Sequence, residues 1–275
     1  MDQQTPRSSL LTLPGAIIIA GAIIAIAIIW VKKPASTVPA ANTTDDRQAQ
    51  ETVNLSPVTA ADHILGNPNA AIKIVEYSDP SCPYCKLFNP TMASIMDQYG
   101  PSGKVSWVYR SFPLDKPDAD GNILHPNAGH ESQALECIAS LGGNDKFWAY
   151  EKNIYAKDTT GTSGLDQKLL PLMAKELGLD TTTFNKCLSS GQFKDRVDAD
   201  SASGVTAGVS GTPTSFLVLT EPLNARSEKY ISDALIQYRI PAELLHAAND
   251  KKLIVMSGAM PKAMVSGLID ALLGD

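Results

Sequence analysis

The sequence predicts an α/β protein that carries a helical insertion and is preceded by a membrane-spanning helix. Three observations lead to this prediction: an uncharged apolar run over 13–31, a strand–helix–strand pattern over 71–109, and two further strands after a mostly helical stretch at 126–208. The chain has 275 residues, of which 44% are hydrophobic, so it can bury a proper core. Its net charge of -6 argues against a nucleic-acid partner, because such proteins need a clustered basic surface.

The N-terminal apolar run is the candidate membrane anchor. Residues Leu13 to Val31 contain no charge, and their number matches the ~20 residues with which a helix crosses the hydrocarbon layer. Trp30 and the two lysines after the run are typical of a membrane interface. A cleaved secretory signal is the alternative, since Ala25-Ile26-Ala27 has the form of a cleavage site. Positive charge flanks the run on both sides, so charge does not decide its orientation.

The chain after the anchor changes from linker to folded domain. No aromatic residue occurs between Pro34 and Pro57, so this stretch reads as a flexible tether. The pattern divides the chain into an N-terminal tail (1–12), a transmembrane anchor (13–31), a flexible linker (32–58), the first half of the α/β domain (59–125), a helical insertion (126–208) and the second half (209–275).

The first half of the domain reads as a βαβ unit. Residues 71–77 are short, apolar and β-branched, as in a buried strand. Turn formers follow, and then a Cys-x-x-Cys motif opens an amphipathic helix that Gly100-Pro101 ends. A second strand covers 105–109. The motif therefore lies at the start of the crossover helix.

The insertion and the second half follow. His125-Pro126-Asn127 reads as the start of the insertion, whose amphipathic patterns predict helices over 128–141, 146–155, 165–177 and 181–188. In the second half, a strand over 215–219 is expected to pair with one over 253–256, before a closing helix over 261–273.

Residues 221–250 interrupt this hairpin. We expect short helices over 227–238 and 242–248, separated by Pro241. The segment is either a docking surface for a partner or an insertion without a binding role.

The Cys82-Pro83-Tyr84-Cys85 motif is the sharpest chemical signal. Two intervening residues let both sulfurs meet across the first helical turn. Cys82 would lie at the helix N-terminus, where free N–H groups and the macrodipole stabilise a thiolate and can lower its pKa from ~8.5 into the ~3.5–7.5 range. Pro83 suits an early helical position, since its missing N–H costs nothing there. Cys85, one turn further, is expected to be the more buried partner.

Two other uses of this motif are weaker. A zinc site would need a second close pair, but Cys137 and Cys187 are isolated and the four histidines lack ligand spacing. A purely structural disulfide between such near neighbours adds little chain-entropy stabilisation. Neither a metal nor an organic cofactor is therefore expected.

This order of elements resembles the thioredoxin fold with an inserted helical domain, and in particular the membrane-anchored branch of the DsbA-like thiol:disulfide oxidoreductases. Five segments carry the resemblance: Gly66–Cys85, Trp107–Leu114, Leu124–Ala128, Gly211–Val218 and Ser257–Pro261.

The resemblance implies roles for individual residues. Cys82 would be the nucleophilic, solvent-facing cysteine, and Cys85 its resolving partner. Pro213, preceded by Thr212, matches the cis-proline that faces the disulfide, the alternative being an ordinary trans proline in a turn. Glu76 matches the buried acid that the family places near the thiols, unless it points out of an edge strand.

One position departs from the best-known DsbA enzymes. Their dipeptide between the cysteines is Pro-His, whereas this chain has Pro83-Tyr84. Tyr84 supplies no imidazole cation to stabilise the thiolate. The motif alone therefore leaves the oxidising strength open.

Cys137 and Cys187 are the remaining cysteines, and the even count predicts a structural disulfide between them. Two buried free cysteines are the alternative. Because structural disulfides persist outside the cytoplasm, the pair places the domain on the extracytoplasmic side.

These observations predict a single-pass membrane protein whose extracytoplasmic domain introduces disulfide bonds through Cys82 and Cys85. Its expected partners are extracytoplasmic proteins with reduced cysteines, a membrane redox protein that reoxidises the pair, and the membrane itself through 13–31. Two alternatives remain: a tethered reductase or disulfide isomerase that uses the same site, and a non-catalytic thioredoxin-like binding module.

Overall fold

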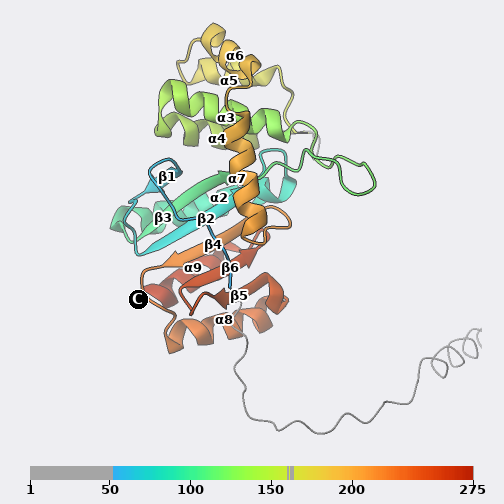
Figure 1. The fold of residues 1–275 in the computed structure, drawn as a ribbon. Coiled ribbons are helices and arrows are strands. Elements are labelled where there is room, and N and C mark those ends of the chain that lie inside the picture. Colours follow the sequence, from blue (N-terminus) through green and yellow to red (C-terminus); the bar gives the residue numbers. More distant parts are fainter. Residues whose placement is uncertain (1–51, 160, 162–163, 275) are drawn as a thin grey trace, which may run out of the picture. The chain divides into compact units, whose positions relative to one another are not determined.

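A six-stranded sheet forms the centre of the domain, in the strand order β1-β3-β2-β4-β6-β5 (Figure 1). The structure is a computed structural model that describes residues 52–159, 161 and 164–274. Its strands are β1 (His63–Gly66), β2 (Ile72–Ser78), β3 (Val105–Ser111), β4 (Thr214–Leu219), β5 (Leu245–Ala248) and β6 (Leu253–Ser257). β2 and β3 run parallel and all other neighbours are antiparallel. The predicted βαβ unit and the pairing of the later strands are therefore confirmed, whereas β1 was not predicted.

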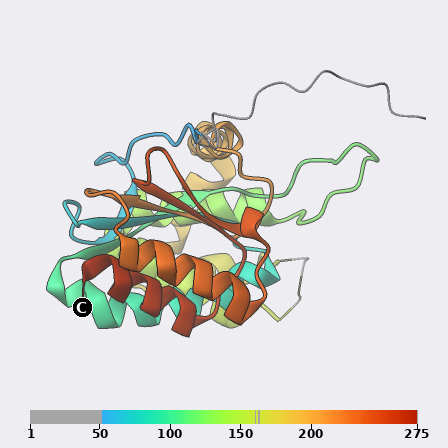
Figure 2. The same cartoon turned by 90° about the horizontal axis from the view of Figure 1, so that it is seen from below.

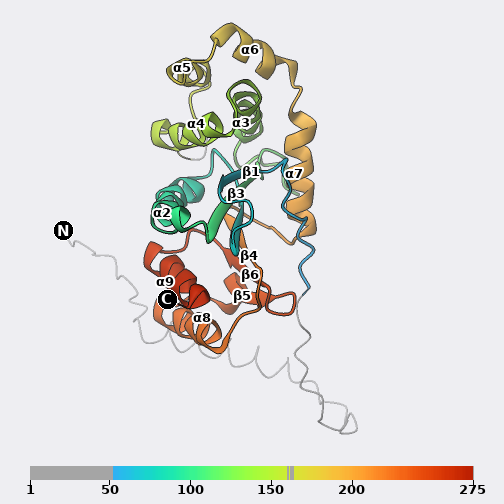
Figure 3. The same ribbon diagram turned by 90° about the vertical axis from the view of Figure 1, so that its left-hand side faces the viewer.

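Helices cover both faces of the sheet. They are α2 (Pro83–Tyr99), α3 (Ala128–Gly142), α4 (Asn144–Lys157), α5 (Leu169–Glu176), α6 (Thr181–Ser190), α7 (Lys194–Thr206), α8 (Ala225–Tyr238) and α9 (Lys262–Leu273). Figures 2 and 3 show α2, α8 and α9 on one face and α7 on the other. The insertion, α3 to α6, stacks at one end of the domain (Figure 1).

The alternation of side chains along β2 explains the two-sided core. Ile72 and Ile74 pack into the larger cluster with α2 and α9, whereas Val75 and Tyr77 pack into the smaller one on the side of α7. Successive side chains of a strand point to opposite faces. Glu76 therefore shares the face of Ile72 and Ile74, the face that α2 covers.

The insertion contains the predicted helices and leads back to the sheet through α7. Gly204 of α7 lies so close to the sheet side that an added Cβ would come within 2.6 Å of Phe112 and 2.9 Å of Tyr77. A small residue is needed there for α7 to approach. α7 thus belongs to the helical stretch in sequence, but it packs on the sheet.

One helix prediction in 221–250 was wrong. Residues 242–248 do not form a helix: a 3-10 turn at Ala242–Leu244 leads into strand β5. β5 pairs with β6 in antiparallel register, and Asn249 to Lys251 adopt left-handed backbone angles in the turn between them. Pairing with an existing sheet edge outweighs local helix propensity here. The helix expected over 227–238 corresponds to α8.

The last residues of the expected linker 32–58 are packed on the domain. Val53 is buried, and its backbone N–H and C=O both bond to the Asn249 side chain at 2.8 Å. Arg110 donates to the carbonyls of Ser56 and Pro57. The folded part therefore begins earlier than residue 59.

The expected anchor lies outside the described residues. Among the helices that the structure describes, none combines the length and the hydropathy needed to cross a membrane.

Candidate functional site

The Cys-x-x-Cys motif lies at the start of α2, after the short turn that follows β2. Cys82 is the N-cap residue of α2, and Pro83 occupies the first turn. No side chain caps this end, so the first N–H groups of the helix are free to face the Cys82 sulfur. The fold thus places the first cysteine where a negative charge is favoured.

Cys82 is a free thiol that donates a 3.4 Å hydrogen bond to the Thr212 carbonyl. A hydrogen bond from the Cys85 thiol, aided by the backbone N–H groups of Tyr84 and Cys85, lowers the pKa of Cys82 to about 6, although burial opposes this. The residue was expected to face solvent, yet its side chain is only 3% exposed. The Thr212 carbonyl and the Tyr155 side chain both contact this residue.

Cys85 is the more buried partner, as expected, with no exposed surface. Its sulfur accepts a 3.5 Å hydrogen bond from the Asp79 N–H. Burial raises the pKa of Cys85 well above its usual range, and the charges of Cys82 and Glu76 add to this effect. At neutral pH the reduced pair therefore holds a thiolate on Cys82 and a thiol on Cys85.

The Thr212–Pro213 peptide bond is cis, and Pro213 is buried. The Pro213 carbonyl accepts a 2.8 Å hydrogen bond from the Gly258 N–H, just beyond β6. This contact fixes the loop beside α2. The segment thereby presents the Thr212 carbonyl to Cys82.

Glu76 is a buried carboxyl on a central strand, since β2 pairs with both β3 and β4. Trp107 Nε1 donates a 2.9 Å hydrogen bond to it. Burial raises the pKa of Glu76 to about 7, and the charge of Cys82 contributes. The carboxyl is therefore half-protonated near neutral pH and is electrostatically linked to the thiols.

Two exposed apolar side chains stand beside the cysteines. Tyr84 is 60% exposed and Leu87 is 68% exposed, both in the first turns of α2. An exposed apolar surface of this kind is typical of contact with another molecule.

The structure adds residues to the site that sequence reasoning missed. The Asp79 carboxylate lies 2.7 Å from the ring nitrogen Nδ1 of His125, and both side chains are buried. Tyr155 packs on Cys82 and Cys85, and its hydroxyl donates to the Asp79 carbonyl at 3.3 Å. Asp79 and His125 both lie in segments that matched the family resemblance, which was the available signal. No sequence pattern pointed to Tyr155.

The insertion is also hydrogen-bonded to the turn that precedes the cysteines. The Ser81 hydroxyl donates a 2.8 Å hydrogen bond to Glu131 of α3, which also accepts the Leu165 N–H at 2.7 Å. Burial raises the pKa of Glu131 to about 7. A titrating carboxyl thus holds the residue that precedes Cys82.

Cys137 and Cys187 form a disulfide that joins α3 to α6, with 6.0 Å between their Cα atoms. The bond closes a separation of 50 residues within the insertion. It is distinct from the Cys82–Cys85 pair, whose sulfurs are both free.

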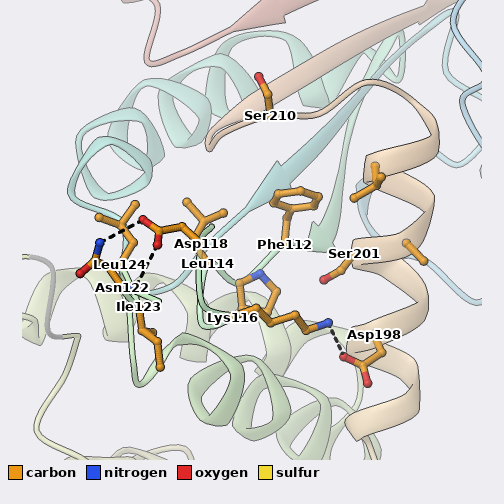
Figure 4. Close-up of a pocket in the computed structure, with 13 residues that line it drawn as sticks. Phe112, Leu114, Lys116, Asp118, Asn122, Ile123, Leu124, Asp198, Ser201 and Ser210 are labelled. Carbon is orange, nitrogen blue, oxygen red and sulfur yellow. Dashed lines mark hydrogen bonds and ion pairs between the residues drawn. The ribbon is translucent and has the colours of Figure 1, made fainter. Parts of the chain in front are cut away.

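Figure 4 shows a groove of about 580 Å³ between the segment after β3 and helix α7. Its walls carry mostly apolar side chains: Phe112, Leu114, Ile123, Leu124, Ala202 and Val205. Ser210, which lies three positions before Pro213, also lines the groove. The thiols do not line this groove, so the exchange site and the groove are neighbouring but separate features.

In residues 52–159, 161 and 164–274 there is no group of three or more His, Cys, Asp or Glu side chains arranged to hold a metal ion.

Two kinds of protein are found among the curated relatives of this chain. The chain is 30% identical over 156 residues to the Na(+)/H(+) antiporter NhaA 3 of Salinispora tropica. The aligned region covers 57% of this chain but only 21% of that protein. It is 27% identical over 157 residues to the probable disulfide bond formation protein D of Bacillus anthracis, covering 56% of this chain and 68% of that protein. The chain thus spans about a fifth of the length of the antiporter.

A solved structure and a family model cover more of the chain. The crystal structure of Wolbachia pipientis α-DsbA1 aligns with a TM-score of 0.57 and 20% identity over 79% of this chain and 93% of that one, and so has the same fold. The family model described as Thioredoxin matches residues 58–232, more than half of the chain. The chain therefore belongs to the thioredoxin family.

Proposed function

We propose that this chain is a membrane-tethered thiol:disulfide oxidoreductase that introduces disulfide bonds into extracytoplasmic proteins through Cys82 and Cys85. The observation that carries the proposal is the asymmetry of the two thiols. The pKa of Cys82 is lowered to about 6, whereas that of Cys85 is raised well above its usual range. A stabilised thiolate makes the reduced pair the favoured form, and hence the disulfide a good oxidant.

The reaction begins with the oxidised pair. A substrate thiolate attacks the Cys82 sulfur of the Cys82–Cys85 disulfide, so a mixed disulfide forms and Cys85 leaves. The released Cys85 thiolate is buried and takes up a proton. Glu76, whose charge acts on Cys85 and whose pKa is about 7, is the buried acid able to supply it.

The second step releases the product. The second thiolate of the substrate attacks the substrate sulfur of the mixed disulfide, and Cys82 leaves as a thiolate. The substrate dithiol has then lost two electrons to the Cys82–Cys85 pair and two protons to the solvent, from which Glu76 regains the proton that it gave to Cys85. The low pKa of Cys82 makes it a good leaving group.

Three observations support the location and the partners. The Cys137–Cys187 disulfide is of a kind that persists outside the cytoplasm. The uncharged run at 13–31 has the length of a membrane span. The relative from Bacillus anthracis is named a probable disulfide bond formation protein. Each turnover leaves the pair reduced, so the proposal includes a quinone-linked membrane redox partner that reoxidises it.

The reduction potential of the Cys82–Cys85 pair tests this proposal. The full-length protein in detergent is equilibrated with glutathione redox buffers, and its free thiols are trapped and counted. A potential near about -120 mV, as in strong disulfide donors, is the expected result. A potential near about -270 mV, as in thioredoxin, would instead assign the same site to a reductase. A Cys82–Cys85 disulfide that glutathione does not reduce would indicate a non-catalytic binding module.

A further inference from the structure

A buried pair of side chains, Asp79 and His125, lies beside the turn that precedes Cys82. Asp79 accepts hydrogen bonds from the Ser81 N–H at 2.7 Å and the Leu114 N–H at 2.8 Å, and its Oδ2 lies 2.7 Å from His125 Nδ1. The Asp79 side chain has no exposed surface and that of His125 is 2% exposed. The two groups are therefore a fixed part of the interior.

The backbone of Asp79 contacts both cysteines. Its carbonyl accepts a 3.0 Å hydrogen bond from the Cys82 N–H, and its N–H donates to the Cys85 sulfur at 3.5 Å. His125 is held in turn by its own N–H, which donates to the Leu114 carbonyl at 2.9 Å. Asp79 thus bonds to His125 through its side chain and to both cysteines through its backbone.

The charges around His125 favour its protonated form. Burial works against protonation, but the hydrogen bond and the charge of Asp79 outweigh it and raise the pKa of His125, with further contributions from Cys82 and Glu131. Asp115, in the segment after β3, is a further carboxyl whose charge is coupled to that of Asp79. The largest charge effects on the ring come from negative groups: Asp79, Cys82 and Glu131. Without a cation, a buried carboxylate at Asp79 would oppose the Cys82 thiolate.

We propose that His125, protonated and held by Asp79, is a positioning residue that compensates the buried negative charge beside Cys82 and so supplies, from outside the motif, the imidazole that Tyr84 does not provide. The proposal rests on exchange chemistry at Cys82, which is the proposed function, but not on the direction of electron flow. Its effect passes through the electrostatics of the site, since no contact between the ring and either sulfur is needed.

The unmodified protein gives the first test. Coupling between two titrating groups is reciprocal. If the His125 cation stabilises the Cys82 thiolate, the thiolate must stabilise the cation. In nuclear magnetic resonance titrations of the full-length protein, His125 should therefore keep its proton to a higher pH in the reduced than in the oxidised form. Identical titration in both forms would overturn the proposal.

Variants give the second test. His125→Gln should raise the pKa of Cys82 by about one unit, which corresponds to about a tenfold shift of the glutathione equilibrium toward the oxidised enzyme. His130→Gln is the matched control, because His130 is an exposed histidine on α3 that bonds to Gln167. The thiolate absorbance of Cys82 measures the pKa directly. An unchanged Cys82 pKa in His125→Gln would contradict the proposal.

A double variant separates charge from packing. Adding Asp79→Asn to His125→Gln removes the uncompensated carboxylate, so the Cys82 pKa should return toward the wild-type value although two buried groups have changed. If His125 and Asp79 serve only to pack the interior, the Cys82 pKa of the double variant should instead move further from the wild-type value. These measurements also distinguish the two proposals: a low reduction potential with a coupled His125 would reject only the oxidase assignment, and a high potential with an uncoupled His125 would reject only this inference.

Discussion

The Ser81 hydroxyl donates a 2.8 Å hydrogen bond to Glu131, across a separation of 50 residues. Ser81 directly precedes Cys82 in the turn, and Glu131 lies on α3 of the insertion. The insertion therefore supports the catalytic turn through a carboxyl that titrates near neutral pH. This contact makes the stability of the domain depend on pH.

Glu131→Gln should flatten the pH dependence of stability. Burial raises the folded-state pKa of Glu131 to about 7, above its ordinary value of 4.5, so the folded state binds the proton more tightly. Its contribution is fully present below pH 4.5 and is lost as pH rises through about 7. In the variant, the fall in unfolding free energy between pH 5 and 8 should be smaller by about 1–3 kcal/mol.

Chemical denaturation at several pH values measures this difference. Glu243→Gln is the control, since Glu243 is exposed. An equally steep pH dependence in Glu131→Gln and in the unmodified protein would show that the buried carboxyl does not titrate in this window.

The two catalytic cysteines should react very differently with alkylating agents. In Cys85→Ser, the introduced hydroxyl can take over the hydrogen bond that the Cys85 thiol makes to Cys82, and the backbone N–H groups at 84 and 85 remain. The Cys82 pKa should therefore stay below its ordinary value of 9.0, and the thiol should react rapidly at pH 7. In Cys82→Ser, the remaining Cys85 thiol is buried and protonated, so alkylation should be slower by about a hundredfold or more. Mass spectrometry of timed samples gives both rates, and comparable rates would refute the assigned order.

Cys82→Ser should also abolish dithiol oxidation.

Glu76→Gln should change the exchange equilibrium only where the carboxyl is ionised. The charge of Cys82 contributes to raising the pKa of Glu76, so the ionised carboxylate in turn disfavours the thiolate. At pH 8 the variant should shift the glutathione equilibrium toward the reduced enzyme, by up to about tenfold for each unit of coupling. At pH 6 the shift should be small. A shift of equal size at both pH values would mean that charge is not the cause.

Replacing both Cys137 and Cys187 by alanine should destabilise the domain without changing its redox chemistry. The bond closes a loop across 50 residues, which is worth about 2–4 kcal/mol in unfolding free energy. The loss is measured by denaturant unfolding without reductant, with Cys82→Ser and Cys85→Ser present in both proteins for this measurement only. The glutathione equilibrium of Cys82–Cys85 should stay unchanged, and a shift there would reveal coupling between the insertion and the thiols.

The parts of the fold with strong periodicity could be predicted from the sequence. Residues 72–77 alternate between two buried faces, and α2 follows the Cys-x-x-Cys motif with regular apolar spacing. With Cys82 and Cys85 assigned to the motif, one disulfide pairing remained possible, and it is the one present. Local pattern and simple counting were sufficient for these features.

The remaining parts depend on contacts between distant segments. Asp79 meets His125 across 46 residues and Tyr155 across 76 residues, and neither partner stands in a pattern that marks the other. Strand β5 was missed for a related reason. Leu245 to Ala248 show no clear alternation, and they become a strand only because β6 offers a free edge.

The two outermost strands have a consequence for the proposed function, in which the domain meets protein substrates. β1 and β5 form the edges of the sheet, and each is only four residues long. A long open edge would invite an unfolded polypeptide to add itself as a further strand, which leads to aggregation. Short edges give such a polypeptide few backbone groups to pair with. Under the proposed function, the domain thus meets reduced substrates at its thiols without becoming a template for their self-association.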